Sequence, residues 1–234
     1  MHLFVPARKN NPELLDEGAG SLEDVRQSLN DLTRINHYLG GIRAITVHLF
    51  RRLKQFHHTA HILDIGTGNA SLSATIEQWG ERHQHSLEIT GLDLMSRHLS
   101  IASQELVADS SIQLLQADGL HLPFADESVD FIVCSLLLHH LTHDEVVHFL
   151  CEVFRCARYS IIINDLVRGY LPYFGYKLIQ PVFNLHPITR QDGETSIMRG
   201  FTPNELQAMA QEADLHNAII HQHPMFRMTL VVDK

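Results

Sequence analysis

The sequence predicts an α/β protein with a doubly wound, seven-stranded, mostly parallel sheet that ends in an antiparallel hairpin. From residue 60 onward, short apolar runs alternate with amphipathic stretches of helical period, an order typical of parallel strands joined by right-handed crossovers. The first apolar run leads directly into the glycine turn Gly66-Thr67-Gly68. The last two apolar runs are separated only by a short segment around Pro224, which predicts the closing hairpin.

The composition favours one domain with a substantial core. Of the 234 residues, 44% are hydrophobic, and the formal net charge is −9. The apolar fraction argues against disorder. The acidic balance argues against a nucleic-acid partner, because phosphate contacts need a basic face. The spacings of the three cysteines fit no zinc module, which predicts free thiols. The start of the chain lacks an apolar signal segment, so we expect a cytoplasmic protein without stable membrane insertion. The oligomeric state is not predicted.

Before the first strand, the residue pattern predicts two helices. Residues 6–20 are rich in Pro, Asn, Glu and Gly and are expected to form a mobile lead-in. After Ser21, apolar residues recur at spacings of three and four, and acidic residues favour a helix start. The glycine pair at 40–41 ends this pattern, and a second amphipathic helix follows. We therefore separate an N-terminal helical segment, residues 1–56, from a main domain, residues 57–234.

In the main domain, apolar periodicity and segment length define the remaining elements. The expected strands are 61–64, 88–92, 112–116, 131–134 and 160–163, the expected helices are about 71–80, 96–108, 143–156 and 203–213, and the hairpin covers 216–222 and 226–232. The last helix has the clearest start. Thr202 can cap it, Pro203 suits its first turn and Glu205 completes a capping box.

Residues 164–201 are an insertion, longer than a connection between a strand and a helix requires. The segment is rich in aromatic residues and prolines. It could form a lid or binding element, an extra helix packed on the core, or an amphipathic strip against lipid, although its basic residues are few. As part of a binding element, Tyr173 and Tyr176 are candidate substrate contacts. Arg168 could orient an acceptor carboxylate or pair with Asp165 as scaffolding.

Acidic residues follow three consecutive strands of the predicted sheet. They are Asp64, Asp93 and Asp118, and they lie on the edge where open α/β sheets bind ligands. A carboxylate can accept from both hydroxyls of a ribose diol, and the offset from Gly68 to Asp93 is near the roughly 20 residues typical of that role. Each acid alone could instead cap a turn or a helix. Three on one edge favour a binding site.

The glycine turn departs from the dinucleotide fingerprint, because Ser71 stands at the third glycine. It resembles instead the first motif of the Rossmann-like (class I) S-adenosylmethionine-dependent methyltransferases, with Ala70 in place of the motif's last glycine. The further motifs are Gly91-Leu-Asp-Leu, Ala117-Asp-Gly-Leu-His-Leu-Pro-Phe, Asp130-Phe-Ile-Val-Cys-Ser and Leu138-His-His-Leu. The resemblance covers roughly residues 40–232. Together with Arg34-Ile-Asn and Asn164-Asp-Leu-Val-Arg, it indicates the branch of ubiquinone/menaquinone-type and polyketide-associated small-molecule enzymes.

This resemblance implies S-adenosylmethionine as the cofactor. The cofactor residues that it implies are Asp64 at the ammonium group, Gly66, Thr67 and Gly68 at the methionyl part, Asp93 at the ribose, Leu94 and Met95 beside the adenine, Asp118, Gly119 and Leu120 around that ring, and Cys134 and Ser135 facing the methionyl part, through a side chain or a backbone carbonyl. The N-terminal helices and the insertion 164–201 would form a helical lid over the cleft.

Eighteen histidines invite a metal hypothesis. They are mostly scattered and form no His-Glu-x-x-His pattern, so no metal is expected. His139 and His140 follow the fourth strand, where the class places its acceptor. Either could act as a general base, with His139 slightly preferred, or could serve only as a positional or helix-start residue.

The expected function is methyl transfer from S-adenosylmethionine to a small, apolar or aromatic acceptor, and oxygen is the expected acceptor atom. One alternative is a non-catalytic protein that binds the cofactor or its demethylated product, S-adenosylhomocysteine, as a sensor. The other is an RNA or protein methyltransferase. Against adenine-amino methylation stand the acidic balance and Cys134-Ser135-Leu136-Leu137 in place of an Asn-Pro-Pro-Tyr-like motif.

Overall fold

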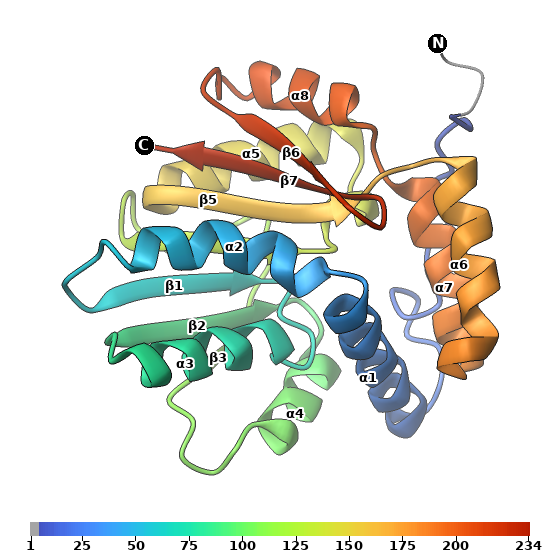
Figure 1. Cartoon of the computed structure of the whole chain (residues 1–234), viewed down its shortest axis with the longest axis horizontal. Coiled ribbons are helices and arrows are strands. Elements are labelled where there is room, and N and C mark those ends of the chain that lie inside the picture. The colour runs from blue at the N-terminus through green and yellow to red at the C-terminus, as the bar shows by residue number, and fades with distance from the viewer. Residues whose placement is uncertain (1–4) are drawn as a thin grey trace.

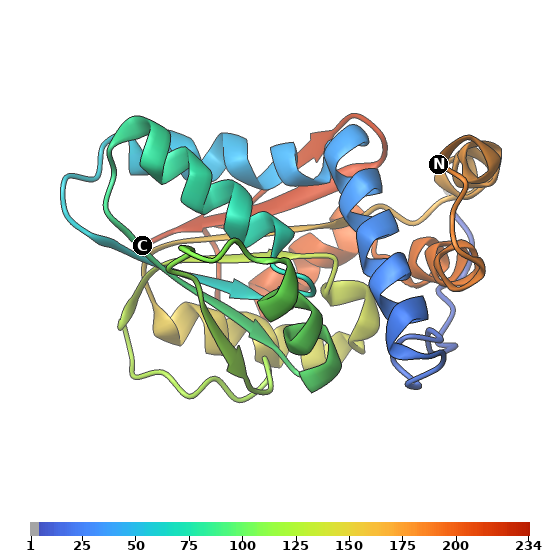
Figure 2. The same ribbon diagram turned by 90° about the horizontal axis from the view of Figure 1, so that it is seen from below.

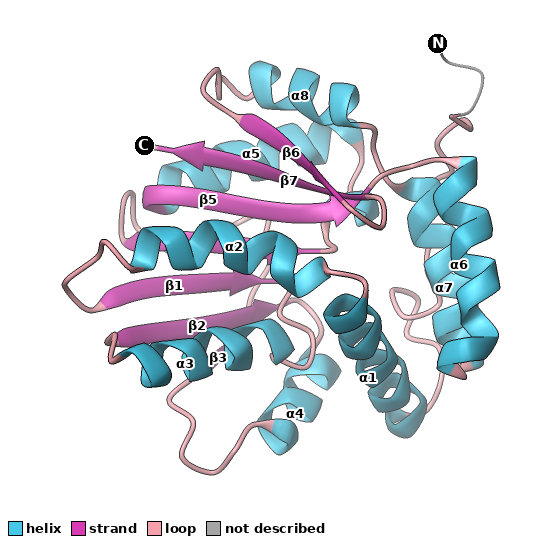
Figure 3. Cartoon of the chain, viewed as in Figure 1, coloured by secondary structure: helices cyan, strands magenta, loops and turns pink. Residues whose placement is uncertain are grey.

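A seven-stranded sheet with the order β3-β2-β1-β4-β5-β7-β6 forms the centre of the computed structural model, which describes residues 5–234 (Figures 1 and 3). The strands are β1 Ala60–Ile65, β2 Leu87–Asp93, β3 Gln113–Gln116, β4 Val129–Ser135, β5 Ala157–Leu166, β6 Ile219–His223 and β7 Arg227–Asp233. The first five are parallel, and β7 runs antiparallel to both β5 and β6. The predicted fold class and closing hairpin are confirmed.

Helices cover both faces of this sheet. The helices of the described residues are α1 Leu22–Tyr38, α2 Gly41–Leu53, α3 Ser71–His83, α4 Ser96–Glu105, α5 His143–Cys156, α6 Tyr170–Phe183, α7 Pro187–Arg199 and α8 Pro203–Glu212, with a short 3-10 turn η1 at Leu138–His140. Apolar side chains of α2 and α3 form one core with the sheet, and those of α5 and α8 form the other. Figure 2 shows α2 and α3 above the sheet and α5 below it. Helix α4 ends earlier than predicted, because Leu106 is already extended.

The strand order reverses between β1 and β4. From β1 the chain proceeds outward to β2 and β3 and then returns to pair β4 with the other side of β1. In open α/β sheets, such a switch point leaves a crevice at the carboxyl ends of the two strands, and ligands bind there. Helices α1, α6 and α7 lie beyond these strand ends (Figure 1).

The insertion forms two helices, α6 and α7, which pack against the N-terminal segment through buried polar contacts. Ser28 and Thr189 share a hydrogen bond of 2.8 Å, and Asp31 accepts from the backbone amide of His186 at 2.6 Å. The outer side of α6 is apolar and exposed, at Leu171, Phe174, Leu178 and Val182. Among the residues described, no helix combines the length and apolarity needed to span a bilayer.

The predicted mobile lead-in is wrong, because much of residues 6–20 is packed in place. Glu13 and Leu15 are buried, and Asp192 of α7 accepts from the backbone amides of Leu14 at 2.7 Å and Leu15 at 3.1 Å. The guanidinium of Arg8 donates to backbone carbonyls that include that of Arg199. Composition reports only local preference, whereas these contacts join segments that are more than a hundred residues apart.

Replacing Asp192 should release this segment. We expect Asp192→Ala to lower the local stability of the lead-in by about 2 kcal/mol, because two buried amides lose a charged acceptor. Hydrogen exchange with mass spectrometry should show faster exchange around Leu14 and Leu15, with the sheet unchanged. Asp109→Ala, at an exposed acid, is the matched control. Exchange at wild-type rates in Asp192→Ala would contradict the assignment.

Candidate functional site

The turn after β1 is built on left-handed backbone. Gly66 has φ 72° and Gly68 has φ 58°, a region that glycine occupies without a steric penalty. The amides of Gly66 and Thr67 both donate to the carbonyl of Leu92 at the end of β2, at 2.8 and 3.0 Å. A Cβ on Gly91 would lie 2.9 Å from the Thr67 hydroxyl, so a glycine in β2 lets the turn approach the neighbouring strand closely.

Asp64, the residue before the last of β1, is buried with its carboxylate beneath this turn. Its Oδ2 accepts from the hydroxyls of Thr67 at 2.9 Å and Ser73 at 2.6 Å. Burial raises the pKa of Asp64 from 3.8 to about 6, in spite of these two hydrogen bonds, and the nearby charge of Asp93 adds to the rise. The carboxylate is therefore ionised at neutral pH at a considerable energetic cost.

Asp93 at the end of β2 connects the turn to the start of α4. Its Oδ2 accepts from the amide of Gly68 at 2.9 Å, and its Oδ1 accepts from the amide of Met95 at 2.9 Å and lies 3.2 Å from Nδ1 of His98. An ionised carboxylate has about four acceptor positions, so capacity remains for a ligand hydroxyl. Asp93 can therefore accept from the backbone amides of Gly68 and Met95 and bind a ligand hydroxyl at the same time.

The residues that follow β3 and β4 form two further parts of the site. Asp118 accepts from the amide of Leu120 at 2.9 Å, and Gly119 is so close to Ile65 that a Cβ would lie 3.1 Å from it. The hydroxyl of Ser135 accepts from the amide side chain of Asn164 at 3.1 Å.

Together with the glycine turn and Asp93, these residues border a cavity of about 490 Å³ at the carboxyl ends of the strands. This volume is within the usual size of small-molecule sites, about 300–1,000 Å³. All but one of the predicted cofactor residues border it: Asp64, Gly66, Thr67, Gly68, Asp93, Leu94, Met95, Asp118, Gly119, Leu120 and Ser135. The exception is Cys134, whose side chain is fully buried in the core with α5. The three cysteines form no disulfide.

The predicted substrate contacts lie elsewhere. Arg168 is buried and donates to the carbonyls of Pro6 and Gly200 and to Glu205, so its scaffolding interpretation fits, although with a different acid from Asp165. The hydroxyl of Tyr176 donates to a backbone carbonyl of α7, and that of Tyr173 donates to Glu194. None of the three borders the cavity.

Residues that the sequence analysis did not select complete the cavity wall. They come from α1 and the lead-in, and they include Glu13, Leu15, Asp16, Leu29, Leu32, Thr33 and Asn36, with His98 and Phe149 from the main domain. The helical spacing of the α1 residues was a usable signal. The lead-in offered none, because it has no periodicity.

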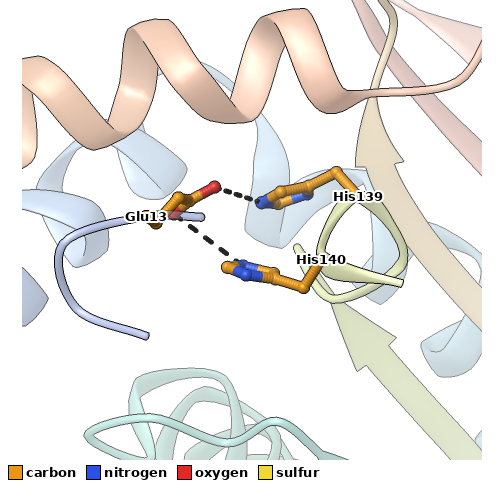
Figure 4. A group of neighbouring side chains, drawn as sticks. All are labelled: Glu13, His139 and His140. Carbon is orange, nitrogen blue, oxygen red and sulfur yellow. Dashed lines mark ion pairs between the residues drawn. The ribbon is translucent and has the colours of Figure 1, made fainter. Parts of the chain in front are cut away.

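The two histidines of η1 differ in position. His140 borders the cavity and His139 does not. His139 is 2% exposed, and its Nδ1 lies 2.7 Å from Oδ1 of Asp165 while its Nε2 lies 3.4 Å from Oε1 of Glu13. Figure 4 shows both rings directed at Glu13.

Two carboxylates decide the charge of His139. Burial by itself would lower the pKa of this imidazole, but the charge and hydrogen bond of Asp165, with those of Glu13, raise it to about 10. The ring is therefore cationic at neutral pH and has no free lone pair with which to take a proton. Of the two histidines, His140 is the one placed for contact with a molecule in the cavity.

The sheet is doubly wound and ends in an antiparallel pair of strands. At its switch point, a cavity bordered by carboxylates lies beside a glycine turn. This combination defines a Rossmann-like class I methyltransferase fold. In agreement, residues 63–160 match the family model described as a methyltransferase domain. Over residues 63–160 the chain therefore matches a methyltransferase domain, in agreement with the resemblance seen in its motifs, and its partial similarity to demethylmenaquinone methyltransferases agrees with the quinone-type branch.

Similarity to known proteins agrees with this assignment. Over 130 residues the chain is 25% identical to a demethylmenaquinone methyltransferase of Staphylococcus epidermidis, with 52% of each chain covered. The chain thus spans about half the length of the curated relatives it matches. Human N-acetylserotonin methyltransferase in complex with SAM has a TM-score of 0.61 at 14% identity, over 96% of this chain and 63% of that chain. Magnesium protoporphyrin IX methyltransferase from Synechocystis PCC 6803 with bound SAH has a TM-score of 0.58 at 14% identity, over 86% and 84%. At these identities the structural likeness concerns the fold.

Proposed function

We propose that this protein transfers the methyl group of S-adenosylmethionine to an oxygen of a small, largely apolar acceptor. The observation that carries the proposal is the convergence of three carboxylates, Asp64, Asp93 and Asp118, with the left-handed glycine turn on one cavity. When bound, the cofactor supplies an electrophilic methyl group on a sulfonium. The protein then mainly has to position donor and acceptor.

The cavity fits this cofactor in size and in chemistry. Gly66 and Gly68 leave the backbone of the turn open to close approach. Buried, ionised Asp64 suits the ammonium group, and the remaining acceptor position of Asp93 suits a ribose hydroxyl. Leu94, Met95 and Leu120 offer apolar surface for an adenine ring, with Asp118 as an acceptor for its amino group.

The acceptor side is proposed to be formed by α1, the lead-in and η1. Leu15, Leu29 and Leu32 give this wall an apolar character, and His140 is its histidine. The curated relatives named for demethylmenaquinone also support an apolar, aromatic acceptor. The proposal assigns the histidine contact with the acceptor to His140 and not to His139.

Tritium transfer from labelled S-adenosylmethionine tests this function. The purified protein is incubated with cell extract, which is then separated into small molecules, RNA and protein. We expect label in the apolar small-molecule fraction. His140→Ala should lower the transfer at least tenfold with cofactor affinity retained, whereas His143→Ala, at an exposed neighbour, should not.

Other outcomes would replace the proposal. Label in RNA or protein would change the acceptor class. Tight cofactor binding with no transfer to any fraction would indicate a sensor that binds S-adenosylmethionine or S-adenosylhomocysteine without catalysis.

A further inference from the structure

Beside the cavity, three potential metal ligands meet in a buried cluster of Glu13, His139 and His140. One ligand atom from each lies within 4.8 Å of the other two. Oε1 of Glu13 is 3.4 Å from Nε2 of His139, and Oε2 is 3.9 Å from Nε2 of His140 (Figure 4). Metal bonds of about 2.0–2.1 Å place tetrahedral ligand atoms roughly 3.3 Å apart. The distance from Glu13 to His139 is close to this value, and the distance from Glu13 to His140 is longer by about half an ångström.

Each histidine is oriented by a second carboxylate at its other ring nitrogen. Nδ1 of His139 is 2.7 Å from Asp165, and Nδ1 of His140 is 2.8 Å from Asp16. A carboxylate can only accept at this position, so both Nδ1 atoms carry the proton and both Nε2 atoms are directed at Glu13. This carboxylate–histidine arrangement is typical of metal-ligating histidines, where the carboxylate fixes the tautomer and increases the basicity of the ligand.

Glu13 is held in the same way. Its Oε1 accepts from the hydroxyl of Ser196 in α7 at 2.7 Å, and its side chain is 7% exposed. The three candidate ligands are thus presented from two separate segments, each fixed by its own partner.

We propose that Glu13, His139 and His140 bind a divalent transition-metal ion of the zinc type. One carboxylate and two imidazoles are a known zinc ligand set, and three protein ligands leave a further coordination position open. Glu13 and His140 border the cavity, so the ion lies at its wall. This site was not anticipated from the sequence, which showed no metal motif.

The charges around the cluster favour a cation. Three carboxylates, Glu13, Asp16 and Asp165, point into it. The neighbouring cations, Arg8 and Arg199, donate to backbone carbonyls of η1 and the residue after it. Arg199 also forms an ion pair of 3.8 Å with Asp16, so the carboxylates of Glu13 and Asp165 carry most of the preference for a cation. A bound ion has to displace the proton that lies between His139 and Glu13.

The site also refines the acceptor class, a step that rests on the proposed function. A bound ion would accept the oxygen of a hydroxyl group at its open coordination position and favour loss of the hydroxyl proton to solvent. The oxygen would then form its bond to the methyl group as the bond from methyl to sulfur breaks, and S-adenosylhomocysteine would leave. The acceptor would then be a phenol or an enol whose oxygen contacts the ion, and His140 would act as a metal ligand instead of a base.

Metal binding can be measured without any acceptor. Chelator-treated full-length protein is titrated at pH 8 with Zn²⁺ by calorimetry and with Co²⁺ by visible absorption. We expect one ion per chain and a Co²⁺ spectrum of low coordination number. Glu13→Gln and His140→Gln should each weaken binding at least a hundredfold, and Asp16→Asn by about 10–100-fold.

His143→Gln serves as the control for an exposed histidine. His221→Gln serves as the control for a separate histidine group, in which the ring of His221 lies 4.4 Å from that of His48. Both variants should bind as wild type does, and thermal unfolding will verify that every variant is folded. Absence of stoichiometric binding to wild type, or equal binding to Glu13→Gln, would overturn the proposal. Titration with S-adenosylmethionine in the same samples keeps its failure separate from that of the proposed function.

Discussion

Asp93→Ala is expected to weaken S-adenosylmethionine binding about a hundredfold or more. A hydrogen bond to a charged acceptor contributes about 1.5–3 kcal/mol, and removal of the carboxylate also leaves the amide of Gly68 in the glycine turn without its acceptor. The loss of about 3 kcal/mol corresponds to roughly a hundredfold in the dissociation constant. Isothermal titration calorimetry with the cofactor and with its demethylated product measures this directly.

The same carboxylate also orders the protein, so the design needs a second variant. Asp93 accepts from the amides of Gly68 and Met95, and Asp93→Ala therefore also loosens the glycine turn. Asp93→Asn keeps one carbonyl acceptor and should lose less affinity. Asp109→Ala, at an exposed acid near the end of α4, should lose none. Affinity within threefold of wild type in Asp93→Ala would refute the ribose role.

The acids and the glycine turn could be predicted because local pattern and topology determine them together. Apolar runs identify parallel strands, and parallel strands deliver the residues after them to one edge. Asp64, Asp93 and Asp118 therefore had to lie near one another once the strands were correct. The same logic predicted the hairpin, since only a short polar segment joins its two runs.

The alternation of side chains along a strand explains why only one side chain of the predicted pair Cys134 and Ser135 borders the cavity. Cys134 and Ser135 are neighbours in β4, and successive residues of a strand point to opposite faces. Only one of the pair can face the cavity. It is Ser135, while Cys134 packs in the core. The sequence motif contains both residues and does not indicate which side chain faces the cavity.

Long-range packing explains why Tyr176 lies outside the cavity and why Glu13 was not predicted to border it. Tyr176 looked like a ligand contact because it is aromatic and lies in an insertion. It packs instead against Gly193, where a Cβ would lie 2.2 Å from its hydroxyl. Glu13 was missed for the opposite reason. It lies in an irregular segment whose position depends on Asp192 and Ser196 of α7, more than 170 residues away.

Asp64→Asn is expected to stabilise the fold near neutral pH while it weakens cofactor binding. The pKa of Asp64 is raised from 3.8 to about 6 by burial, and this difference corresponds to about 3 kcal/mol of unfavourable free energy when the group is ionised. An asparagine oxygen can still accept from Thr67 and Ser73, the two hydroxyls that now bond to Asp64. The neutral variant keeps these contacts without a buried charge.

The pH dependence gives this prediction its sign. Because the folded-state pKa is above the unfolded value, the folded protein binds more protons between about pH 4 and 6. The contribution of Asp64 is therefore favourable below pH 4 and is lost as the pH rises through 6. Urea unfolding of both proteins should show equal stability near pH 4 and a gain for Asp64→Asn of up to about 3 kcal/mol above pH 6. A variant less stable at every pH would show that the carboxylate acts only as a cap.

The cofactor should respond in the opposite direction. S-adenosylmethionine is cationic, so it favours the ionised form of Asp64, and its binding releases the proton that the carboxyl group holds below pH 6. Wild-type affinity should therefore increase as the pH is raised from 5 to 7, whereas the affinity of Asp64→Asn should be lower and nearly constant over that range. A buried charge that destabilises the empty protein is reasonable only where a ligand of opposite charge completes the site. Equal pH profiles for the two proteins would remove Asp64 from that role.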